Sequence, residues 1–144
     1  MEIQLNWVAI IVITLVSFFF GAAWHGKYFF GDIWLRMHYG KTEFTEFTDA
    51  EMKKAMEGMN IIMFAEFIAT FLMVMTLAFL MKVLPGFSPW HVVFLVWIGF
   101  VLPTITSTVI WGADAKRWMM PKILISGSFR LMALLFAGYI LSIW

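Results

Sequence analysis

Four long runs of apolar residues, separated by polar stretches, organise the chain. They extend over residues 7–24, 60–81, 90–111 and 122–144. A bilayer core of about 30 Å requires about 20 mostly apolar residues in a helix, and each run approaches that length. Within the runs, apolar and polar residues alternate too little for the strands of a membrane barrel. The pattern therefore predicts an all-α fold, an integral membrane four-helix bundle that forms one domain over residues 1–144.

The polar stretch between the first and second runs predicts an interfacial helix after the first transmembrane helix. Over residues 29–39, apolar side chains recur on one helical face, while Asp32 and Arg36 lie on the other. That arrangement is typical of a helix lying at the membrane surface. The alternative is an irregular loop that contains several aromatic residues.

Capping patterns place the starts of two later helices. Thr48-Asp49-Ala50-Glu51 is a capping box, so the second membrane helix is expected to begin at residue 49 and to extend beyond the bilayer. Ser88 and Pro89 are typical of a cap and a first helical residue. The expected membrane helices are 7–24, 49–81, 89–111 and 121–144.

Basic residues indicate which ends of the helices face the cytoplasm. The first and third connections contain or border most of them, namely Lys27, Arg36, Lys41, Lys53, Lys54, Lys116, Arg117 and Lys122. The second connection has only Lys82 near it. Because positively charged residues stay in the cytoplasm, both termini are expected outside. The acidic start of the chain argues against a cleaved signal peptide.

Composition excludes several classes of function. Hydrophobic residues make up 62% of the chain and charged residues 13%, against roughly half and a quarter in soluble domains. The net charge of +1 gives no basic face for nucleic acid, and the absence of cysteine removes thiolate chemistry. No phosphate loop, zinc motif or nucleophile elbow is present, so neither an enzyme nor a cofactor is expected. A surface cluster of His25, Asp32, His38, Glu43 and Glu46 leaves a membrane-surface enzyme as one alternative.

Two charged residues lie inside apolar runs, Glu66 in the second and Arg130 in the fourth. Each costs about 2.5–3.5 kcal/mol near a helix centre, so such residues rarely face lipid. Counting from the cytoplasmic ends of the runs places both about 9–12 Å deep. Three interpretations remain open: an ion pair that fixes helix neighbours, a titrating or cation-binding Glu66 on a permeation path, and two residues that do not meet.

Hydroxyl side chains are expected at a similar depth. Pro103 removes a backbone hydrogen bond to Gly99, and hydroxyl residues follow it. With one residue of the fourth run, they form a possible polar vestibule of Thr104, Thr106, Ser107, Thr108 and Ser126. The alternative is that these hydroxyls bond their own backbone or glue helices together.

Methionines recur along one stripe of the second helix, from Met52 to Met73. Thioethers suit Cu(I), but they also fill helix seams, and the three histidines are scattered. We therefore expect a packing face and no metal site.

Two short segments resemble a known family. They are Gly21-Ala22-Ala23-Trp24-His25 and Phe29-Phe30-Gly31-Asp32-Ile33-Trp34. The pattern resembles the end of the first helix in a bacterial integral-membrane family, domain of unknown function 1761, with His25 in place of the usual Tyr. Its motif residues here are Gly21, Trp24, His25, Phe30, Gly31 and Trp34. The resemblance implies four membrane helices and a prokaryotic cytoplasmic (inner) membrane, but no activity.

The sequence thus favours a small multi-pass membrane protein of unknown activity. The first hypothesis is a non-enzymatic protein in the lipid bilayer that self-associates as a homo-oligomer or serves as an accessory subunit of a membrane complex. The alternative is a small oligomeric transporter or channel that uses Glu66 and Arg130, because one chain of this length leaves little room for a path.

Overall fold

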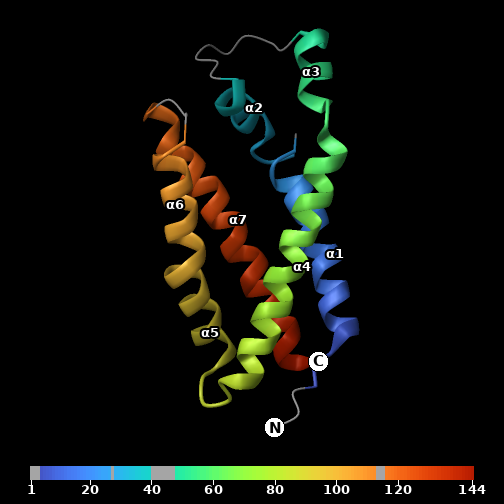
Figure 1. Ribbon diagram of the computed structural model, residues 1–144, viewed down its shortest axis with the longest axis vertical. Helices are drawn as coiled ribbons and strands as arrows, with labels where there is room; N and C mark the ends of the chain where they lie inside the picture. Colours follow the sequence, from blue (N-terminus) through green and yellow to red (C-terminus); the bar gives the residue numbers. More distant parts are fainter. Residues whose placement is uncertain (1–3, 27, 40–47, 113–115) are drawn as a thin grey trace.

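The computed structural model describes residues 4–26, 28–39, 48–112 and 116–144 (Figure 1). These residues form helices and connections, with no strand among them. The elements are α1 (Trp7–Trp24), α2 (Gly31–Tyr39), α3 (Asp49–Met56), α4 (Met59–Val83), α5 (Pro89–Val96), the π-helix η1 (Trp97–Val101), α6 (Leu102–Ile110) and α7 (Lys116–Ile143). Within these ranges, four helices, counting α5 to α6 as one, are long and apolar enough to cross a membrane. The predicted four-helix membrane bundle is confirmed.

Side-chain caps begin three of these helices. Asn6 accepts a hydrogen bond from the Ala9 amide at the start of α1, at 3.1 Å. At the start of α3, the Thr48 hydroxyl accepts from the Glu51 amide, and the Glu51 carboxylate accepts from the Thr48 amide at 2.9 Å. Ser88 caps α5, with Pro89 as its first residue. Each cap satisfies amides that have no partner within the helix.

The prediction of a single helix over residues 49–81 is wrong, because the helix is interrupted between α3 and α4. Glu57 is extended, and Gly58 has a φ of +72°. That left-handed conformation carries little strain in glycine but is costly for other residues. The capping box therefore starts a separate short helix, and α4 begins afresh at Met59 without a side-chain cap.

The third and fourth membrane helices also differ from the expected ones. The third contains the π-helix η1, in which the Leu102 amide donates to the carbonyl of Trp97, five residues earlier. This wider turn immediately precedes Pro103, which has no amide to donate. The fourth, α7, begins at Lys116 rather than 121, because Pro121 removes only one hydrogen bond from a long helix.

The hydrophobic core lies in one half of the bundle. We call the end with the α4–α5 connection the termini end, because α1 begins and α7 ends there, and the opposite end the α2 end (Figure 1). The buried core cluster comes from four helices near the termini end. Its members are Ala9, Ile10, Ile13, Val74, Leu77, Ala78, Val92, Val93, Leu134 and Ala137. Small residues allow close approach there: a Cβ on Gly138 would lie 2.6 Å from Cγ2 of Val93.

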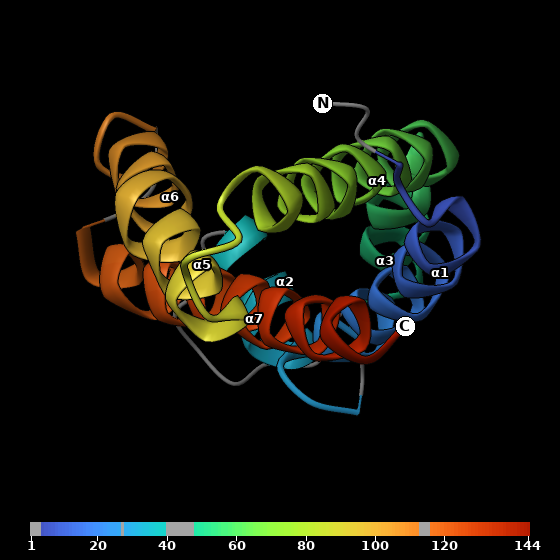
Figure 2. The same ribbon diagram turned by 90° about the horizontal axis from the view of Figure 1, so that it is seen from below.

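The half nearer the α2 end is open. α4 and α6 diverge from one another toward that end (Figures 1 and 2). No residue of α4 between Met59 and Ala69 is buried, and Val109 is the one buried residue of α6. In the described part of this half, a few buried apolar residues such as Val109 and Ile125 are joined by polar and aromatic contacts.

Candidate functional site

Glu66 and Arg130 join α4 to α7 in the open half. Nη2 of Arg130 lies 2.8 Å from Oε1 of Glu66 and donates to Oε2 at 3.0 Å. The Thr70 hydroxyl donates to Oε1 from one turn along α4, at 3.4 Å. The side chains remain 38% exposed for Glu66 and 22% for Arg130. The two opposite charges that the sequence places at matched depth thus meet across two helices.

Distances along the two helices place the pair toward the α2 end. At 1.5 Å per residue, about 26 Å of helix separates Glu66 from Val83 and about 21 Å separates Arg130 from Trp144. Side chains also tilt toward the helix N-terminus, which for both helices is the α2 end.

Phe129 connects the charge pair to the end of α1. Its ring is 3% exposed and packs onto Gly21, where a Cβ would lie 2.7 Å from Cζ of Phe129. The imidazole of His25 meets the ring edge-on, with centroids 5.2 Å apart. The guanidinium carbon of Arg130 lies 5.2 Å from the same ring centroid. Only glycine at position 21 leaves room for this ring against α1.

The other motif residues form the corner between α1 and α2. Trp24 donates its indole N–H to the carbonyl of Ile125 at 3.2 Å, and its ring packs on Phe30 at 5.0 Å. Gly31 fits against backbone, since a Cβ there would lie 2.5 Å from the carbonyl oxygen of Gly26. Trp34 meets the His25 ring at 4.6 Å. All six motif residues thus contribute to one aromatic corner that rests on α7.

His25 has a defined hydrogen-bonding state. Its Nδ1 lies 3.1 Å from the carbonyl oxygen of Gly21. Because a carbonyl only accepts, Nδ1 carries the proton of the neutral ring. Burial lowers the pKa of His25 below its ordinary value of 6.5; the Gly21 bond and the Glu66 carboxylate raise it in part, and Arg130 lowers it further. The charges of Glu66 and Arg130 therefore both affect the pKa of His25.

Two hydroxyl groups of the expected polar vestibule bond their own helix. Thr104 donates to the carbonyl of Phe100 at 2.6 Å, and Thr108 donates to that of Thr104 at 2.8 Å. Ser107 is exposed, whereas Thr106 and Ser126 are half-buried. Among the residues that the structure describes, the hydroxyl bonded to Glu66 belongs to Thr70 instead. The bonds of Thr104 and Thr108 both run to the carbonyl four residues earlier, as is common for hydroxyl residues in helices.

Sequence reasoning missed a second indole contact with α7. Trp97, in the π-helix, donates its indole N–H to the carbonyl of Gly127 at 3.0 Å. Together with Trp24, it places two indole donors on carbonyls of the segment Ile125–Gly127. The available signal was a tryptophan in mid-span, which needs a partner for its N–H when it is buried.

Only part of the surface cluster considered for an enzyme lies among the described side chains, namely those of Asp32 and His25. Asp32 pairs with Arg36 on its own helix at 3.1 Å, and His25 faces Trp34 and Phe129. The side chain of His38, and Glu43 and Glu46, lie outside the described residues. The contacts of Asp32 and His25 are thus with other groups, not with each other.

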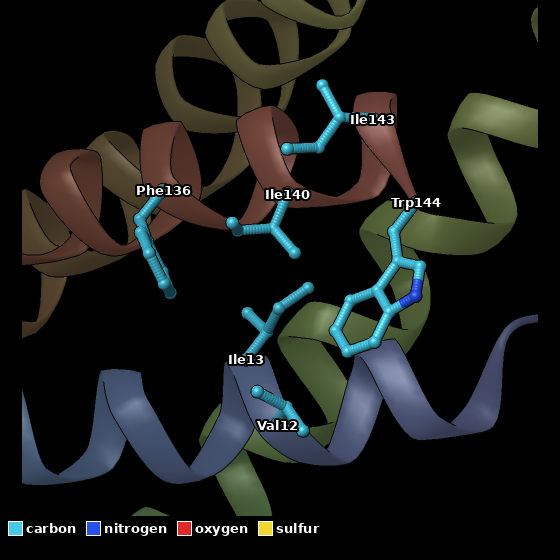
Figure 3. Close-up of a pocket in the computed structure, with 6 residues that line it drawn as sticks. All are labelled: Val12, Ile13, Phe136, Ile140, Ile143 and Trp144. Carbon is cyan, nitrogen blue, oxygen red and sulfur yellow. The ribbon is translucent and has the colours of Figure 1, made fainter.

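Two cavities lie elsewhere, along the seam between α1 and α7. One of about 180 Å³ is lined by Val12, Ile13, Phe136, Ile140, Ile143 and Trp144 (Figure 3). The other, of about 200 Å³, is lined by Val16, Ser17, Phe20, Met132, Ala133 and Phe136. Neither lining contains a charged residue. These cavities suit apolar groups and do not extend the polar site.

Comparison with known proteins gives a family but no activity. No curated protein and no solved structure matches the chain. A family model described as protein of unknown function (DUF1761) matches residues 8–142, which is nearly the whole chain. That match includes all six motif residues and both members of the charge pair. The chain therefore belongs to the DUF1761 family of proteins of unknown function.

Proposed function

We propose that this protein is a non-enzymatic subunit of a membrane assembly formed by copies of itself. The observation that carries the proposal is the open half of the bundle. There, α4 has no buried residue from Met59 to Ala69, and α6 has only Val109. Helices with so few buried residues offer surfaces that a second copy can cover.

The exposed face of α6 is the surface best suited to that contact. It presents Thr104, Ser107 and Thr108 along successive turns, all of them exposed. Helices in membranes associate through small and hydroxyl-bearing residues, because these let backbones approach closely and exchange hydrogen bonds. The hydroxyls of Thr104 and Thr108 already have backbone acceptors, so they enter an interface without an unsatisfied donor.

Orientation and location are part of the same proposal. The α2 end carries Arg36, Lys53, Lys54, Lys116, Arg117 and Lys122, whereas Lys82 lies near the termini end. By the positive-inside rule, the α2 end faces the cytoplasm and both termini lie outside, in a prokaryotic cytoplasmic membrane. Cysteines introduced at Gly86 and Glu57 test this: an impermeant thiol reagent applied outside should label position 86 only. Labelling of position 57 would reverse the topology.

Cysteine crosslinking tests the assembly directly, because the natural chain has no cysteine. Ser107→Cys should give a disulfide-linked dimer on oxidation in native membranes. The matched control is Val8→Cys on α1, which is 62% exposed and lies away from the proposed interface. A dimer band at position 107 but not at position 8 supports the proposal. Equal bands, or no band at either position, would contradict it, as would a monomer at all concentrations in native mass spectrometry.

The second candidate function is ion or proton movement through an oligomer, favoured by the partial exposure of Glu66 and Arg130. Intramembrane carboxylates of this kind often lie on ion pathways. Proteoliposomes containing the wild type would then show a cation or proton flux that Glu66→Gln abolishes while the dimer survives. Equal flux from protein-free liposomes would exclude this candidate.

A further inference from the structure

His25 lies where the first membrane helix ends, near the pair that Glu66 and Arg130 form between two other membrane helices. Its ring is held on two sides, by Trp34 of α2 at 4.6 Å and by Phe129 of α7 at 5.2 Å. Phe129 in turn lies 5.2 Å from the guanidinium carbon of Arg130. A single aromatic ring thus contacts both the histidine and the arginine.

The hydrogen bond of Nδ1 leaves the other ring nitrogen to accept a proton. Since Nδ1–H donates to Gly21, the lone pair of the neutral ring is on Nε2. Protonation at Nε2 would therefore keep the Gly21 bond and add a positive charge and a second donor. No change of tautomer or of ring orientation is needed beforehand.

Charged groups near the ring come from two helices. Glu66 of α4 attracts a positive charge on His25, and Arg130 of α7 repels it. On α2, Asp32 and Arg36 are bonded to each other at 3.1 Å, and the residue that meets the imidazole is the uncharged Trp34. A proton on His25 is therefore stabilised by the same carboxylate that Arg130 holds.

We propose that His25 is a proton-binding site that competes with Arg130 for the carboxylate of Glu66. The proton comes from water at the α2 end and binds Nε2, with no covalent bond broken. One carboxylate then faces an imidazolium and a guanidinium, so its contact with Arg130 weakens. The half-buried position of His25, one residue beyond α1, gives that proton a short route.

Weakening of the Glu66–Arg130 contact affects the first half of α4. This segment has no buried residue before Thr70, and its described contacts include the Glu66–Arg130 pair and the edge-on packing of Phe67 on Phe18 at 5.6 Å. It also follows the left-handed Gly58, which can act as a hinge. Weakening the pair therefore lets this part of α4 move relative to α7. The inference does not depend on assembly, since all these contacts lie within one chain.

Nuclear magnetic resonance in nanodiscs that hold a single copy tests the coupling. With histidine rings and Glu side-chain carboxyl carbons labelled, the Glu66 carboxyl signal should shift with the same midpoint as the His25 ring signal. The His25→Gln variant identifies the ring signal and should abolish this shift of Glu66. A Glu66 signal that is unchanged through the His25 titration, or that still shifts in His25→Gln, would overturn the proposal.

Two further variants give opposite expected changes. Glu66→Gln removes the attracting charge and should lower the midpoint of His25, whereas Arg130→Met removes the repelling one and should raise it. Shifts in the same direction, or none, would also overturn the proposal. Because the wild type and His25→Gln supply the first result, misfolding of Glu66→Gln or Arg130→Met does not leave the question open. Failure here with a dimer at Ser107→Cys would contradict the proton site and not the assembly.

Discussion

Gly21→Ala is predicted to destabilise the protein, because the added methyl group meets the ring of Phe129. The new Cβ would lie 2.7 Å from Cζ, whereas optimal carbon contacts are about 3.5–4.0 Å. The ring is 3% exposed and is flanked by His25 and Phe20, so it has little room to move. Overpacking of this kind costs about 1–3 kcal/mol.

Helix propensity opposes that cost only in part, since alanine is favoured over glycine by about 1 kcal/mol in a helix interior. The expected net loss is about 1 kcal/mol, or roughly a fivefold change in the ratio of folded to unfolded protein. Reversible unfolding in bicelles, followed by circular dichroism, measures it. A second change, Phe129→Leu, should reduce the penalty of Gly21→Ala because the ring tip is removed.

Gly99→Ala is the matched control for this prediction. A Cβ at Gly99 meets nothing within 4 Å, so the same substitution should be neutral or slightly stabilising. Equal effects of Gly21→Ala and Gly99→Ala would refute the assignment of Phe129 to the surface of α1.

Two further predictions concern the contacts of Trp97 and His25. Trp97→Phe should destabilise the protein by about 1 kcal/mol, because the hydrogen bond to Gly127 is lost. Trp90→Phe, at an exposed ring, should leave the stability unchanged. Equal unfolding curves for the two variants would contradict this prediction. Stability should also fall as pH drops below about 6.5, because the pKa of His25 is lowered on folding and the unfolded chain then binds more protons. His25→Gln should flatten that part of the pH profile, and an unchanged slope would contradict the cause.

The membrane helices and their caps follow from local sequence. Apolar runs and the residues Asn6, Thr48 and Ser88 act within a turn or two, so their effects can be predicted without knowledge of the fold. The Glu66–Arg130 contact was also within reach, because a charge in an apolar run needs a partner at its own depth.

Other features depend on contacts that the sequence pattern does not contain. Gly58 interrupts the helix with its left-handed conformation. Because the residues around it favour a helix, the sequence pattern does not predict this interruption. That Thr104 and Thr108 bond their own helix, whereas Thr70 supplies the hydroxyl bonded to Glu66, can be seen only in the folded structure. In the sequence, Phe129 is one apolar residue among many. Its role becomes apparent only in the fold, where it contacts Gly21 and His25.

The central claim is that one charge pair, continuous with the aromatic corner, holds α4 to α7 in the open half of the bundle. A double-mutant cycle with Glu66→Gln and Arg130→Met, measured by unfolding in bicelles, tests it most directly. With Glu66 38% exposed, the expected coupling free energy is about 0.5–1.5 kcal/mol, in the lower range for residues in contact. A favourable coupling of that size supports the account. Additive effects, with coupling near zero, would contradict it.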